Sequence, residues 1–235
     1  MATEARRPGR DERYPDERRL GWDERHRSGD FEGEGPNPTL VLGAAGLRVG
    51  SALELAAGSG TNAVWLAGQG WQTTAVDWSP VGLANGRAKA RAAGVEIEWL
   101  ERDLFAWSPP PGSFDLVVIV YLHVPPVERG PVYAAAAAAV APGGRLLVVG
   151  HDRINATEGE GGPPDTVRLF TADEIARELL ASGSGNGSAA GPATVLLSPA
   201  AASFDMFVDY AARGQAFRDA VAALAGRRRR AGSDR

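Results

Sequence analysis

Five apolar runs between Ser51 and Gly150 constrain the fold of this chain more than any other feature. In order they read SALELA, WQTTAVD, VEIEWLERD, FDLVVIVYLHV and GRLLVVG, and alanine-rich stretches separate them. Short apolar runs rich in β-branched and aromatic residues are typical of buried strands, and the stretches between them have helical composition. This alternation predicts an α/β fold, with a doubly wound, mostly parallel sheet and helices on both faces.

Helix boundaries in the sequence agree with this pattern. Ser79 followed by Pro80 places a capping oxygen before a residue suited to the first helical position. Thr171 with Glu174 three residues later forms a capping box. The alanine run after Pro131 predicts a helix that begins or kinks at that proline.

The chain divides into one domain and two tails. Its 235 residues, 44% of them hydrophobic, are enough for one sizeable core. Residues 1–21 mix both charges with few apolar side chains, so we expect a disordered N-terminal tail. Residues 22–182 form the expected domain. Residues 183–235 turn abruptly to Gly, Ser, Ala and Arg, and we expect an atypical, partly disordered segment whose only strand-like runs are 193–197 and 204–210.

Composition excludes several classes of function. Cysteine is absent and the three histidines lie far apart, so the sequence predicts no metal site. No signal peptide or membrane-length apolar run is present, which favours a cytoplasmic protein without a membrane partner. A formal charge of −4, with one basic cluster at the extreme C-terminus, argues against nucleic acid as a partner. The sequence does not specify an oligomeric state.

The turn after the first run is a candidate cofactor site. Residues 58–63 read GSGTNA, which satisfies the dinucleotide pattern G-x-G-x-x-G/A, and Asp77 follows at about the spacing of a ribose-binding acid. The Gly-Lys-Ser/Thr ending of a phosphate-binding P-loop is missing. An NAD(P)-binding oxidoreductase is therefore one interpretation of this turn.

Three further features favour S-adenosylmethionine over a dinucleotide. Glu54 is an acid inside the first strand, and the ammonium of an amino-acid cofactor needs such a negative neighbour. Asp103 and Leu104 follow the third strand, where a carboxylate can accept from an adenine amino group while an apolar side chain packs on the ring. A Tyr-x-x-x-Lys hydride-transfer site is excluded, because Lys89 is the only lysine and no tyrosine precedes it by four residues.

From about Trp22 to Leu180 the chain resembles the class I S-adenosylmethionine-dependent methyltransferases, which implies a Rossmann-like fold. The matching motifs, in chain order, are ELAAGSG at 54–60, DWS at 77–79, RDL at 102–104, FDLVV at 114–118 and APGGRLLVV at 141–149. WDER at 22–25 and YLHVP at 121–125 resemble the small-molecule branch that includes tellurite-resistance and thiopurine methyltransferases. The resemblance implies methyl transfer to a small-molecule acceptor.

The same resemblance assigns residues to the cofactor and to the reacting centre. Those assigned to the cofactor are Glu54, Ala56, Gly58 and Gly60 for the methionine part, Asp77 for the ribose hydroxyls, and Trp78, Asp103 and Leu104 for adenine. Tyr121 would lie beside the transferable methyl. His123 and His151 follow the fourth and fifth strands, and either could act as a general base for a hydroxyl or amine acceptor.

Ala56 departs from the family pattern, because it stands where the first glycine is usual. If the backbone there needs a positive φ, its methyl group costs about 1 kcal/mol. A cofactor-binding scaffold without turnover is therefore a third interpretation.

Overall fold

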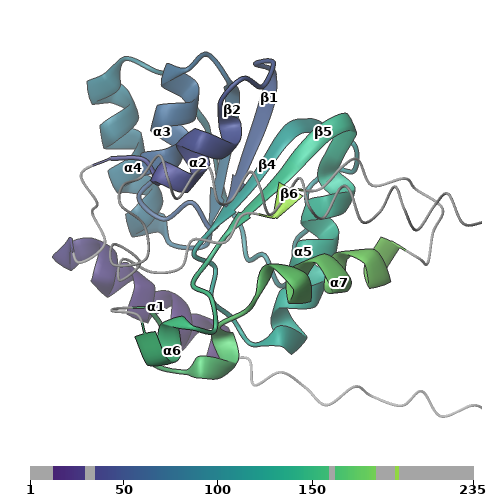
Figure 1. Cartoon of the computed structure of the whole chain (residues 1–235). Coiled ribbons are helices and arrows are strands. Elements are labelled where there is room, and N and C mark those ends of the chain that lie inside the picture. The colour runs from purple at the N-terminus through teal and green to yellow at the C-terminus, as the bar shows by residue number, and fades with distance from the viewer. Residues whose placement is uncertain (1–12, 30–34, 159–161, 184–193, 196–235) are drawn as a thin grey trace, which may run out of the picture.

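Six parallel strands form one sheet in the order β3-β2-β1-β4-β5-β6 (Figure 1). The computed structural model describes residues 13–29, 35–158, 162–183 and 194–195. The strands are β1 (Ser51–Leu55), β2 (Gln72–Asp77), β3 (Glu98–Glu101), β4 (Phe114–Val120), β5 (Val140–Val149) and β6 (Thr194–Val195). The doubly wound, Rossmann-like arrangement expected from the alternating pattern is confirmed.

Helices cover both faces of this sheet (Figure 1). They are α1 (Arg13–Ser28), α2 (Pro38–Ala44), α3 (Thr61–Gly68), α4 (Pro80–Ala93), α5 (Pro126–Ala139), α6 (Asn155–Glu158) and α7 (Ala172–Gly183), with a 3-10 turn η1 (Thr166–Arg168). On one face Tyr133 of α5 and Ile175 of α7 pack on Leu53 and Val117. On the other, Leu40 of α2 and Leu66 of α3 pack against alternate residues of the same strands.

The expected helix caps are present. Ser79 Oγ accepts from the N–H of Gly82 at the start of α4, and Pro80 is its first residue. Thr171 Oγ1 accepts from the N–H of Glu174, whose carboxylate accepts from the N–H of Thr171 in return. Helix α5 begins at Pro126, earlier than Pro131, which lies inside it.

Two glycines let the chain pack tightly under the indole of Trp99. A Cβ on Gly60 would lie 2.4 Å from the ring, and one on Gly86 of α4 would also lie 2.4 Å from it. Gly60 additionally has a φ of 68°. Trp99 therefore packs against both α4 and the turn after β1 and holds them together.

The ends of the domain differ in part from expectation. Residues 13–21, which we expected in a disordered tail, form the first half of α1, where Arg18 pairs with Glu128 of α5 and Arg19 pairs with Asp23 of the same helix. At the other end β6 pairs parallel to β5 through Leu147 and Thr194. The strand expected at 204–210 lies outside the described residues.

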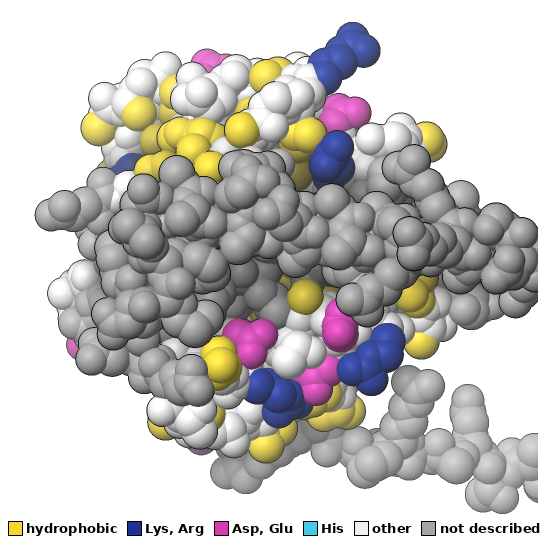
Figure 2. Space-filling view, viewed as in Figure 1, with side chains coloured by type: hydrophobic (Ala, Val, Ile, Leu, Met, Phe, Trp, Pro, Cys, Tyr) yellow, Lys and Arg dark blue, Asp and Glu magenta, His cyan; other side chains and the backbone are white. Residues whose placement is uncertain are grey.

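Surface features in the described part of the chain are mixed. Figure 2 shows Lys or Arg side chains beside Asp or Glu side chains on the visible face. Among the helices that the structure describes, none combines the length and apolar character needed to cross a membrane. An open groove of about 780 Å³ lies at the amino ends of the strands, lined in part by Ser51, Gln72 and Phe114, away from the turn after β1.

Candidate active site

The site lies at the carboxyl ends of the neighbouring strands β1 and β4, where the order of connections reverses. In open α/β sheets this switch point is the usual ligand crevice. Ala56 follows β1 with a φ of 58°, and Tyr121 follows β4 with a φ of 59°. Among the described residues they are the only non-glycine residues in the left-handed region. The backbone is therefore strained at both sides of the crevice.

Asp77 organises the glycine turn through both carboxylate oxygens. Oδ2 accepts from the N–H of Gly58 and Oδ1 from the N–H of Ser79, each at 2.8 Å. The side chain is buried, and burial raises its pKa, while the backbone N–H bonds act in the opposite direction. Asp77 thus fixes the distance between the turn after β1 and the end of β2.

Glu54 lies beneath the same turn and is almost completely buried. Its Oε1 accepts from Asn62 Nδ2 at 2.9 Å, and Oε2 has no hydrogen-bond partner among the described residues. Burial raises the pKa of Glu54 to about 8, against the opposing effect of the Asn62 bond. A buried carboxyl with one unpaired oxygen is suited to meet a cationic group.

Lys89 contacts the glycine turn from α4, although from the sequence it served only to exclude another chemistry. From α4 its Nζ donates to Ser59 Oγ at 2.9 Å and to Thr61 Oγ1 at 3.0 Å. The signal was available, since both hydroxyl residues lie in the glycine motif.

Trp78 and Phe105 form an aromatic corner beside the turn, with ring centroids 6.0 Å apart. The guanidinium of Arg18 lies 5.6 Å from the Trp78 centroid and 5.2 Å from that of Phe105, and it pairs with Glu128 at 2.9 Å. Asp103 Oδ1 accepts from the N–H of Phe105 at 2.8 Å. Leu104 packs against the core under this corner.

Helix α1 crosses the carboxyl edge of the sheet (Figure 1). The buried Asp23 accepts from Ser79 Oγ. The buried His26 lies against the turn, where a Cβ on Gly58 would come 3.1 Å from its ring. Sequence reasoning missed Arg18, Asp23 and His26 as parts of the site; the WDER stretch at 22–25, which contains Asp23, was an available signal for that residue alone.

Three of the expected residues form one cluster of nearly parallel rings. The His151 ring lies 4.8 Å from Tyr121 and 4.9 Å from His123. His123 Nε2 accepts from the backbone N–H of His151 at 2.9 Å. Burial, followed by the charge of His151, lowers the pKa of His123 to about 4, and burial also lowers the pKa of His151. Both rings are therefore neutral at pH 7.

Residues 52–144 match the methyltransferase-domain family. Within this range the chain carries a class I S-adenosylmethionine-dependent methyltransferase domain. The matched range begins in β1 and ends in β5, so it contains the glycine turn, Asp77 and the Trp78 corner of this methyltransferase domain.

Similar proteins cover the methyltransferase domain only in part. A demethylmenaquinone methyltransferase of Thermus thermophilus is 36% identical over 47% of this chain and 50% of its own length. A UDP-N-acetylmuramoylalanine–D-glutamate ligase of Deinococcus radiodurans is 39% identical over 42% of this chain but 21% of its own. The chain thus spans a fifth to a half of these relatives.

One solved structure has the same fold over more of the chain. A TehB-like S-adenosylmethionine-dependent methyltransferase from Corynebacterium glutamicum aligns with a TM-score of 0.51 over 71% of this chain and 83% of its own, at 18% identity. At this identity the likeness concerns the fold.

The residues of the methyltransferase domain fit the cofactor that its family uses. Glu54 is buried with Oε2 unpaired among the described residues, and the ammonium of the cofactor would supply a positive partner there; this role of Glu54 is a prediction too. The roles predicted for Ala56, Gly58 and Gly60 toward the methionine part, for Asp77 toward ribose, and for Trp78, Asp103 and Leu104 toward adenine remain predictions. When bound, the cofactor supplies an electrophilic methyl group on a sulfonium.

Proposed function

We propose that the chain catalyses S-adenosylmethionine-dependent methyl transfer to a small-molecule acceptor by in-line displacement. The observation that carries the proposal is the meeting of two sets of residues across the β1/β4 switch point. On one side Asp77 holds the glycine turn, and on the other Tyr121, His123 and His151 form a ring cluster. Under this proposal the glycine turn would hold the cofactor and the ring cluster would border the acceptor, at the same edge of the sheet.

The residues would act mainly by positioning. Holding reacting groups collinear can supply about 7 to 11 kcal/mol of the barrier. Tyr121, whose ring is 41% exposed, would border the transferable methyl, because its backbone leaves β4 at the switch point. The small-molecule branch is supported by the similarity to a demethylmenaquinone methyltransferase.

Calorimetry with S-adenosylhomocysteine and with NAD tests the cofactor. We expect S-adenosylhomocysteine to bind and NAD not to bind. Asp77→Asn should weaken S-adenosylhomocysteine binding by about tenfold or more, since it removes a charged acceptor. Asp173→Asn, an exposed change on α7, is the matched control and should leave binding unchanged.

Two outcomes would contradict the proposal. Binding of NAD alone would favour an NAD(P)-dependent oxidoreductase. Binding of S-adenosylhomocysteine without methylated product, over a panel of thiol, amine, hydroxyl and metalloid acceptors, would favour a cofactor-binding scaffold, to which the strained Ala56 would then be relevant.

A further inference from the structure

The ring cluster contains two histidines, and the structure gives them different surroundings. We propose that His151 accepts the proton of an acidic hydroxyl on a planar, sp2-carbon acceptor, such as a phenol or enol, and that His123 is a positioning residue for His151. This inference rests on the proposed methyltransferase function and names the acceptor class for the same site.

His123 is unsuited to accept the proton. Its Nε2 lone pair already accepts from the N–H of His151 at 2.9 Å, so its own ring proton is at Nδ1. Protonation of Nε2 would break this bond and leave a buried backbone N–H unpaired. Burial also lowers the pKa of His123 to about 4, which makes protonation of this ring unfavourable at neutral pH.

The ring of His151 contacts two rings, that of Tyr121 on the side proposed for the acceptor and that of His123, the proposed positioning residue. Its ring is nearly parallel to Tyr121, at 18°, and to His123, at 30°. Nδ1 is buried and has no hydrogen-bond partner among the described residues. The nitrogen left to meet an acceptor is therefore Nε2, on a ring that is about half buried.

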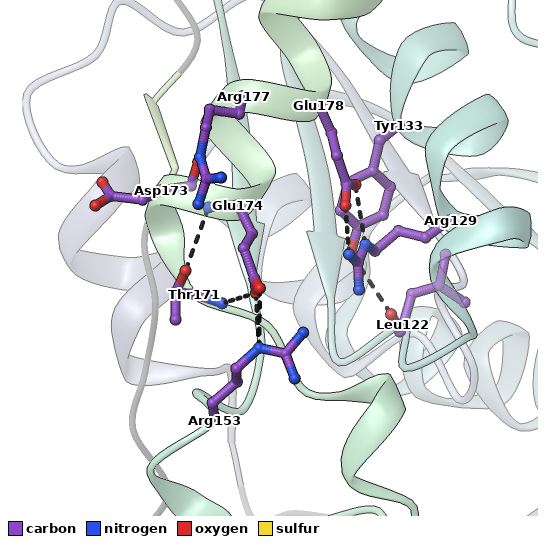
Figure 3. Close-up of polar contacts among 9 residues, drawn as sticks. All are labelled: Leu122, Arg129, Tyr133, Arg153, Thr171, Asp173, Glu174, Arg177 and Glu178. Carbon is purple, nitrogen blue, oxygen red and sulfur yellow. Dashed lines mark hydrogen bonds and ion pairs between the residues drawn. The ribbon is translucent and has the colours of Figure 1, made fainter.

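The loops that carry both histidines are tied to α5 and α7 (Figure 3). Arg153, two residues after His151, donates from Nε to both oxygens of Glu174, at 2.9 and 3.0 Å. Tyr133 Oη donates to the carbonyl of Leu122, beside His123. The backbone of His151 is held directly as well, because its carbonyl accepts from the N–H of Phe170.

Gly150 leaves room for the core residue Phe170 beside the segment that leads to His151. A Cβ at that position would lie 2.2 Å from the ring of Phe170. Phe170 in turn lies 5.9 Å from the His123 ring. The glycine thus allows Phe170 to support His123 while the chain continues to His151.

Burial limits the strength of His151 as a base, because it lowers the pKa of this ring. Tyr121 and His123 face it from the segment after β4, and Arg129 of α5 and Arg168 of η1 are cations near His123 whose charges oppose protonation. Asp152 and Arg153 follow it in its own loop, and Asp152 Oδ1 accepts from the N–H of Ile154. No carboxylate among the described residues bonds to Nδ1.

A base without such a carboxylate can take a proton only from an acceptor that is already acidic. A phenolic hydroxyl, with a pKa of about 10, is far closer to imidazole than an aliphatic hydroxyl is. The exposed ring of Tyr121, stacked on His151, also offers a flat face to a planar acceptor.

The step balances in atoms and charge. The hydroxyl proton passes to His151 Nε2 while the oxygen lone pair forms the bond to the methyl carbon. The carbon–sulfur bond breaks and its electron pair remains on sulfur. The imidazolium then returns the proton to solvent.

Nitrogen-15 NMR of the histidine rings in the full-length protein tests the division of roles without turnover. The chain has three histidines, so single substitutions assign all signals. We expect His123 as the Nδ1–H tautomer, without titration between pH 5 and 8, and titration of His151 below its ordinary pKa. His123→Gln, which keeps an oxygen acceptor for the His151 N–H, should preserve the His151 signals, whereas His123→Ala should shift them. Titration of His123 near neutral pH, or His151 signals unaffected by His123→Ala, would overturn the positioning role.

Kinetics on phenolic, aliphatic hydroxyl and thiol acceptors tests the substrate class. His151→Gln should lower kcat on a phenol by about a hundredfold and abolish its rise with pH, with S-adenosylhomocysteine affinity unchanged. His123→Ala should lower kcat by about tenfold with KM and the pH profile kept, and His123→Gln should restore kcat. Arg177→Gln, on the exposed side of α7, is the control. Turnover confined to aliphatic hydroxyls or thiols, or full activity of His151→Gln, would overturn the inference even where S-adenosylhomocysteine binds.

Discussion

At the scale of single residues, Ala56 shows how a strained backbone can persist at a binding edge. Its φ of 58° costs an L-residue about 1 to 2 kcal/mol relative to its ordinary conformations. The surrounding hydrogen bonds hold it there, because the next residue, Ala57, donates its N–H to the carbonyl of Val76 in β2. From the sequence we expected the methyl group of Ala56 to cost stability if the backbone there had a positive φ. The observed φ is positive, so the condition for that cost is met.

Ala56→Gly should raise the free energy of unfolding by about 0.5 to 1 kcal/mol, since relief of strain exceeds the added entropy of the unfolded chain. Urea denaturation followed by circular dichroism measures this. Ala88→Gly, in the exposed interior of α4, is the control and should lower stability by about 1 kcal/mol. A loss of stability in both variants would contradict the strain argument.

The positions of single residues could be predicted from sequence where a motif fixes a backbone geometry. Asp77 and Glu54 lie beside the glycine turn, as the strand-turn-helix pattern predicts, while their roles toward the cofactor stay predictions. Arg18 and His26 were missed, because their partners lie far along the chain and no local pattern reports such contacts.

At the scale of elements, the strands were predictable because burial on both faces leaves an uninterrupted apolar run. The register of β6 beside β5 was not, since two strand residues carry no such signal. Helix α1 was not predicted either. It has almost no apolar periodicity, and its docking depends on ion pairs and on Asp23.

Helix α4 gives a prediction at this scale. Gly86→Ala should lower the free energy of unfolding by about 1 to 3 kcal/mol despite its better helix propensity, because the new Cβ would lie 2.4 Å from Trp99. Thermal unfolding followed by calorimetry measures the change. Gly130→Ala in α5 meets no atom within 4 Å and should instead be neutral or stabilising. If the two variants were equally stable, Trp99 would move away from the new Cβ without loss of folding free energy, which would contradict this prediction.

At the scale of the whole molecule, the buried carboxyls should link stability to pH. The folded-state pKa of Glu54, about 8, lies above its ordinary 4.5, so its contribution is full below pH 4.5 and is lost as pH rises through 8. His123 acts oppositely, since its folded pKa of about 4 removes stability only as pH falls below 6.5.

Between pH 6.5 and 8 the free energy of unfolding, without cofactor, should therefore fall by up to about 1 kcal/mol per pH unit. Glu54→Gln should flatten that slope, because it removes the group whose pKa lies near 8 in the folded protein. Urea titrations at several pH values measure both slopes. If the slope were unchanged in Glu54→Gln, the pH dependence of stability would come from groups other than Glu54.

The docking of α1 also sets an order of events during synthesis. Asp23 bonds to Ser79, 56 residues later, and Arg18 bonds to Glu128, 110 residues later. Helix α1 leaves the ribosome before both partners, and Glu128 emerges 110 residues after Arg18. The edge that would receive the cofactor is therefore completed only after Glu128 is made, when β1 to β4 can already have paired.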